Sequence, residues 1–136
     1  MERAISVNNA KELGKALDDE AIEIIITDPK TGKDVIRIKA TKKAAMVVAV
    51  GCVVVAVVAL LSSPAAAAAG PAGIAVEGFI AAPVLGGAIS VWGVATTIAA
   101  VSIGIGARSG KILYKLYNDY DIVKNGHNRV VLRRKG

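Results

Sequence analysis

Residues 44–61 read AAMVVAVGCVVVAVVALL, eighteen consecutive residues without a charged side chain. As an α-helix this segment would rise about 27 Å, close to the roughly 30 Å hydrocarbon thickness of a bilayer. It lacks the alternation of apolar and polar residues that is typical of membrane barrel strands, and a lone strand in lipid would leave its backbone polar groups unsatisfied. We therefore predict a membrane-spanning helix over about residues 44–63, ended by Pro64.

A second apolar segment, PVLGGAISVWGVATTIAAVSIGIGA at residues 83–107, is also long enough to cross a bilayer with some tilt. The connector, residues 64–82, exceeds a tight turn and is apolar but broken by glycine and proline, so we expect it at the far interface or partly re-entrant. Glu77, the only charged residue between Lys43 and Arg108, is a possible intramembrane acid. The alternative places its carboxylate at the level of the lipid headgroups.

Small residues recur along both segments at alternating steps of four and three, which places each set on one stripe of a helix. Small residues let membrane helices approach closely. We predict that the two stripes form the seam of an antiparallel helical hairpin. Its members are Ala45, Ala49, Cys52, Ala56 and Ala59 in the first helix and Gly86, Ser90, Gly93, Thr97, Ala100 and Gly104 in the second. A further small stripe on the second helix, interrupted by Trp92, would face a neighbouring chain: Ala88, Ala95, Ala99, Ser102 and Gly106.

Basic residues flank the apolar block at both ends and mark candidate contacts with anionic lipid headgroups. They are Lys39, Lys42 and Lys43 before the block and Arg108, Lys111 and Lys115 after it. Basic residues next to membrane segments mark the cytoplasmic side. The sequence therefore predicts a two-pass protein of the inner or plasma membrane with both termini in the cytoplasm.

The polar ends of the chain predict a small α+β cytoplasmic cap built from residues 1–43 and 108–136. In the first part we expect short strands near residues 5–7 and 21–27, a helix capped by Asn9 and Glu12, a turn at residues 28–33, and a returning strand at residues 34–40. In the second part we expect a basic juxtamembrane helix followed by a β-hairpin, turning at Asn125 and Gly126, with His127 exposed at its tip. Neither part has enough core to fold alone, so the two should pair, within one chain or between chains.

The sequence contains no arrangement of residues that is typical of an enzyme's active site. One histidine and one cysteine cannot supply a metal cluster or a nucleophilic triad, and the segment at residues 104–113 lacks the spacing of a phosphate-binding loop. We therefore expect no catalytic residues, no metal, no cofactor and no small-molecule substrate. The basic C-terminal residues suit anionic lipid better than nucleic acid, because no aromatic stacking residues accompany them.

Size and layout are similar to those of many small bacterial membrane proteins. In composition, the apolar block also resembles the hairpin that bacterial pore-forming toxins such as colicins insert, and this resemblance implies a pore. We therefore predict a small integral membrane protein that forms homo-oligomers through its Gly/Ala-lined helices, as a pore or as a membrane-remodelling or scaffolding assembly. The alternative is a passive anchor whose cap binds a protein or nucleic-acid partner.

Overall fold

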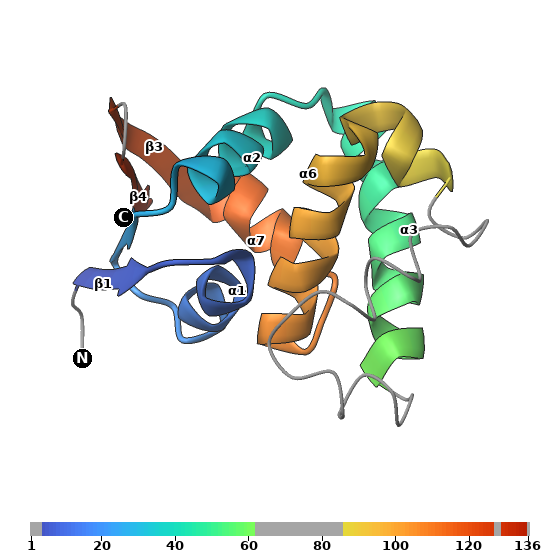
Figure 1. The fold of residues 1–136 in the computed structure, drawn as a ribbon, viewed down its shortest axis with the longest axis horizontal. Helices are drawn as coiled ribbons and strands as arrows, with labels where there is room; N and C mark the ends of the chain where they lie inside the picture. The colour runs from blue at the N-terminus through green and yellow to red at the C-terminus, as the bar shows by residue number, and fades with distance from the viewer. Residues whose placement is uncertain (1–3, 62–85, 127–128, 136) are drawn as a thin grey trace.

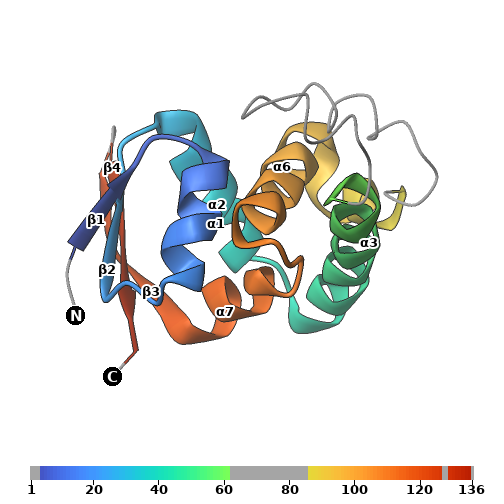
Figure 2. The same cartoon turned by 90° about the horizontal axis from the view of Figure 1, so that it is seen from below.

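The structure, a computed structural model, describes residues 4–61, 86–126 and 129–135 and shows a mixed α+β fold with one long apolar helix. A sheet lies at one end, helices α1, α2 and α7 cover one face of it, and α6 and then α3 lie beyond them, with α3 outermost (Figures 1 and 2). The elements in chain order are β1 (Ala4–Val7), α1 (Ala10–Asp18), β2 (Glu23–Ile26), α2 (Pro29–Lys39), α3 (Lys43–Leu61), α6 (Gly86–Ala107), α7 (Ile112–Asp119), β3 (Tyr120–Gly126) and β4 (Arg129–Arg134).

The four strands form one sheet in the order β1-β2-β4-β3, in which β1 and β2 are parallel and the other neighbours are antiparallel. The pairing of β2 with β4, with Ile24 opposite Leu132, joins the two ends of the chain into one unit. Both of these side chains are fully buried under the helices. The predicted strands near residues 5–7 and 21–27, the C-terminal hairpin, and the pairing of the two ends are therefore confirmed, here within one chain. The predicted turn at Asn125 and Gly126 is wrong, because both residues still belong to β3 and pair with Val130 and Arg129.

Helix α1 begins as its sequence predicts. The side chain of Asn9 accepts a hydrogen bond from the backbone N–H of Glu12 at 2.8 Å, and the Glu12 carboxylate accepts one from the backbone N–H of Asn8 at 2.8 Å. This reciprocal arrangement satisfies backbone donors that the first turn of a helix leaves free. Leu13 and Leu17 on its inner face are completely buried.

Helix α2 corrects the prediction for residues 28–40, where a turn and a strand were expected. Asp28 is the N-cap, its carboxylate accepts hydrogen bonds from the N–H and hydroxyl of Thr31, and Pro29 occupies the first turn. Asp followed by Pro is a signal for a turn and equally for a helix start. The buried residues Thr31, Val35 and Ile38 are spaced by four and three, which is a helical period.

Helix α6 is bent rather than straight, because Gly93 adopts a non-helical backbone conformation with φ 82° and ψ 170°. Trp92, just before the bend, donates a hydrogen bond to Thr41 at the start of α3, whereas Gly104 lies against Val57 in the later half of α3. The longer part of α6 therefore runs in the same direction as α3 (Figure 1), and not antiparallel to it as the hairpin prediction requires.

One further prediction needs correction, and others concern residues that the structure does not describe. A break follows α6 at Arg108, which has φ 60°, so the juxtamembrane helix does not continue from α6 but begins again as α7. The connector at residues 64–82, Glu77 within it, and His127 lie outside the described residues.

Candidate membrane-facing site

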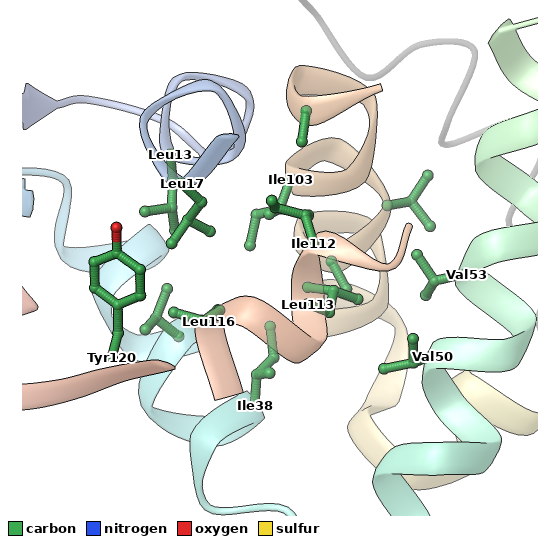
Figure 3. Close-up of a cluster of buried hydrophobic side chains, with 14 of the residues drawn as sticks. Leu13, Leu17, Ile38, Val50, Val53, Ile103, Ile112, Leu113, Leu116 and Tyr120 are labelled. Atoms are coloured by element: carbon green, nitrogen blue, oxygen red, sulfur yellow. The ribbon is translucent and has the colours of Figure 1, made fainter. Parts of the chain in front are cut away.

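Helix α3 is apolar on every side, yet the residues that the structure describes cover only one side of it. Val50 and Val53 point inward toward a cluster of side chains from α1, α2, α6 and α7 (Figure 3), and both are fully buried. The opposite side, which we call the outer face, leaves its large side chains between 42% and 61% exposed. The outer face consists of Val47, Val48, Gly51, Val55, Val58 and Leu61.

Exposed basic residues border the outer face. Lys42 and Lys43 stand at the start of α3. Arg108 and Lys111 flank Gly110, whose backbone is packed directly on Val54 of α3. Every charged residue that the structure describes between positions 42 and 111 is basic.

Two other predicted headgroup residues are placed differently. The ammonium group of Lys39 donates hydrogen bonds to the carbonyl oxygens of Leu116, Tyr117 and Tyr120, at 3.0, 3.1 and 2.5 Å, and so closes the C-terminal end of α7. Burial lowers the pKa of Lys39, partly offset by the nearby carboxylate of Asp121. This ammonium group is therefore engaged inside the protein and is not free for lipid.

Lys115 lies 3.8 Å from the carboxylate of Glu20, which is mostly exposed. Such a surface pair contributes little to stability, so it does not fix Lys115 strongly. Lys115 is nevertheless on α7, away from the outer face, and only four of the six predicted basic residues border that face.

The structure brings part of the predicted seam together. Ala49 and Ala56 of α3 are buried, as are Thr97, Ala100 and Gly104 of α6. The Cys52 side chain is close to Gly87 rather than to a predicted seam residue of α6. The remaining members are only partly covered or exposed: Ala45 and Gly93 are half-buried, and Ala59, Gly86 and Ser90 are exposed.

One member of the second small stripe of α6, Gly106, packs against α1 of the same chain, whereas Ala95 of that stripe is exposed. A Cβ atom at Gly106 would overlap the backbone carbonyl of Lys11, and one at Gly14 would overlap the carbonyl of Ile103. The two backbones can approach this closely only because both positions are glycine. Half of the most apolar part of α6 is thus buried inside the protein.

A buried polar contact between α2 and α6 was not found from sequence. Thr96 donates a hydrogen bond to the Asp34 carboxylate at 3.0 Å, and Asp34 is only 7% exposed. Burial raises the pKa of Asp34, while the hydrogen bond from Thr96 and the charges of Lys30 and Arg37 oppose that rise. The available signal was its spacing, because Asp34 follows Thr31 on the buried face of α2.

A second group of hydrogen bonds lies next to the bend of α6. The indole N–H of Trp92 donates to the hydroxyl of Thr41 at 2.7 Å, and that hydroxyl donates to the carbonyl of Arg37 at 3.0 Å. The Tyr117 hydroxyl donates to the backbone carbonyl of Thr41. Thr41 thus contacts α6 and α7 and connects the end of α2 with the start of α3.

The sheet has a second, uncovered face on the side away from the helices (Figure 2). A shallow hollow of about 390 Å³ lies on it, lined by Glu23, Ile25, Val123, Arg129, Val131 and Arg133. Arg133 and Glu23 form an ion pair across it at 3.0 Å. Within the described part of the chain, no three His, Cys, Asp or Glu side chains gather as a metal site would require.

Among the described residues, one helix, α6, is long and apolar enough to cross a membrane. A buried core helix meets the same criterion, and α6 has that position in this fold. The chain matches no protein-family model, no curated protein and no solved structure. The argument for function therefore depends on the geometry of α3, α6 and the residues around them.

Proposed function

We propose that this protein is a non-enzymatic membrane protein that self-assembles at the bilayer into a pore or a membrane-remodelling or scaffolding assembly. The observation that carries the proposal is the outer face of α3, where five large aliphatic side chains stand exposed with no polar residue among them. Burying one such side chain completely is worth about 1.5–3 kcal/mol. An apolar surface of this kind marks a membrane or protein contact.

Lipid is the partner that this surface favours. A helix that is apolar on all sides suits either a protein interior or a bilayer, and the outer face of α3 is not inside the protein. The basic residues that border it would meet anionic headgroups, which attract each Lys or Arg with about 1 kcal/mol. We place the protein at the inner or plasma membrane on this basis.

In the assembled state we propose that α3 and α6 span the bilayer as a two-pass hairpin, with both termini in the cytoplasm. The apolar length of α6 supports this state. To reach it, α6 must straighten at Gly93, reverse its direction relative to α3, and leave α1 and α2. The predicted seam of small residues would then provide contacts between helices, within one chain or between chains.

A passive anchor is the second candidate, and the uncovered sheet face favours it. That face lies at the opposite end of the molecule from α3, so a membrane-bound chain would present it to the aqueous phase (Figure 2). Its hollow combines apolar side chains with two arginines, a composition suited to a protein partner.

Membrane association is tested by the double substitution Val48→Gln with Val55→Gln, which makes the outer face polar without touching the core. We expect this variant to shift from the membrane fraction to the aqueous fraction. Val123→Gln is the matched control, because Val123 is 49% exposed but lies on the sheet. Equal membrane recovery of the wild-type chain and the double variant would remove the proposed role of α3.

Self-assembly is tested by native mass spectrometry in mild detergent, together with dye release from vesicles. The assembly proposal expects a defined oligomer, and a pore also expects release of the dye. A uniform monomer that binds membranes without releasing dye would instead support the passive anchor.

A further inference from the structure

We infer that the compact fold described here is itself a membrane-docking form, in which α3 lies flat along the surface of an anionic bilayer while α6 stays inside the protein. The inference rests on the proposed function and adds to it the lipid class and the first bound state. The outer face of α3 would lie at the boundary between headgroups and acyl chains, and the four bordering basic residues would contact the headgroups.

The shape of α3 suits this orientation. Its nineteen residues extend about 28 Å along the edge of the molecule, and its exposed side is apolar from Val47 to Leu61. Helices that bind in the plane of a membrane bury an apolar face about 5–10 Å into the interface. The inner side of α3 is already packed on α6, so lipid is required to cover one side only.

The charges around α3 are complementary to an anionic surface. Lys42 and Lys43 stand at one end of the helix, and the loop with Arg108 and Lys111 lies beside it. The described acidic side chain nearest in sequence to α3 is Asp34 of α2, and it is buried against α6 rather than on the outer face. A bilayer that meets the outer face therefore meets positive charge first.

Docking in this way leaves the internal contacts of α6 intact. Removing α6 from α2 and from the segment between α2 and α3 would break the bond between Asp34 and Thr96 and the bond between Trp92 and Thr41. A buried acid or indole deprived of its partner costs about 1–3 kcal/mol. The docked state requires none of these losses, so it should form before any state in which α6 spans the bilayer.

Two reporters separate docking from spanning. In a Cys52→Ala, Val55→Cys variant, an environment-sensitive nitrobenzoxadiazole dye at position 55 reports entry of α3 into lipid. Trp92, the single tryptophan, is 1% exposed and reports on α6. Full-length protein is mixed by stopped flow with phosphatidylglycerol vesicles whose lipids are brominated deep in the acyl chains, and with phosphatidylcholine vesicles. The same dye at Val123→Cys is the control.

We expect the dye at position 55 to brighten on anionic vesicles, in a phase during which the fluorescence of Trp92 is not quenched by bromine. The dye at position 123 should stay unchanged. Raising the salt from about 0.1 M to about 1 M, which shortens the Debye length from about 10 Å to about 3 Å, should weaken this docking.

Quenching of Trp92 in the same phase as the brightening at position 55 would overturn the inference, because α6 would then enter lipid as the protein binds; the proposed function would still stand. Equal docking on phosphatidylcholine would overturn the assignment of anionic lipid. No change of either reporter on any vesicle would remove the inference and the proposed function together.

Discussion

Asp34 shows how one residue couples the cap to the apolar helices. Its carboxylate lies between α2 and α6, and burial raises its pKa above the usual 3.8. Because the folded state holds this proton more tightly than the unfolded state, the stabilisation is complete below the unfolded pKa and is lost as the pH rises through the folded pKa. At neutral pH the buried charge therefore weakens the compact fold.

Asp34→Asn should remove this pH dependence. The amide keeps a hydrogen-bonding partner for Thr96 but carries no charge, so the variant should gain stability relative to the wild-type chain as the pH rises from about 4 to 7. Urea unfolding followed by Trp92 fluorescence at several pH values measures the effect. Asp19→Asn, at an exposed carboxylate, is the control. A constant difference between wild type and Asp34→Asn across this range would contradict the prediction.

At the scale of elements, the bend at Gly93 sets the path of α6 in the compact fold. Gly93 has a backbone conformation that side chains with a Cβ atom rarely adopt, so the bend depends on glycine. A straight membrane helix has no such requirement. The same residue therefore favours the compact fold over the proposed spanning state.

Gly93→Ala should destabilise the compact fold by about 1–3 kcal/mol, because a non-glycine residue would be strained there. Gly51→Ala is a close control, since a Cβ atom at either glycine has no neighbour within 4 Å but Gly51 lies in regular helix. It should stabilise the fold by roughly 0.5–1 kcal/mol through helix propensity. Chemical denaturation measures both, and equal effects of the two substitutions would show that the bend is not a determinant.

At the scale of the whole molecule, the exposed apolar face of α3 and the uncovered face of the sheet lie at opposite ends. The outer face of α3, bordered by lysines and arginines, lies at one end, and the open sheet face lies at the other (Figure 2). An arrangement of this kind orients a protein on a membrane before any helix inserts.

Lys42→Gln combined with Lys43→Gln should weaken binding to phosphatidylglycerol vesicles by about 30-fold, given about 1 kcal/mol for each lysine near the surface. Lys15→Gln combined with Lys33→Gln removes the same charge from exposed positions on α1 and α2. Vesicle co-sedimentation at fixed salt compares the two pairs. The orientation would be wrong if both pairs weakened binding equally.

Most of the cap could be predicted from sequence because its signals are local. The cap at Asn9 and the alternation at Ile24 and Ile26 each act within a few residues. The error at residues 28–40 has a local cause too, because the alternation of Ile36 and Ile38 suggested a strand where Asp28 and Pro29 start a helix.

Some residues of the candidate site could be predicted from sequence and others could not. Composition alone indicated the apolar block and its basic borders, and Lys42, Lys43, Arg108 and Lys111 do lie beside α3. The use of Lys39 inside the protein could not be predicted, since its partners are the carbonyls of residues more than seventy positions away.

The sequence by itself determined where the apolar helices and most cap elements other than α2 lie, because hydrophobic runs and helix caps are properties of neighbouring residues. Only the tertiary structure decided that α6 bends at Gly93, runs alongside α3 in the same direction, and is sheltered by α1 and α2. Those features depend on contacts such as Asp34 with Thr96, sixty-two residues apart, and on backbones that approach at Gly14 and Gly106. Local sequence signals are compatible with several arrangements of these helices, and the packing of distant segments selects one of them.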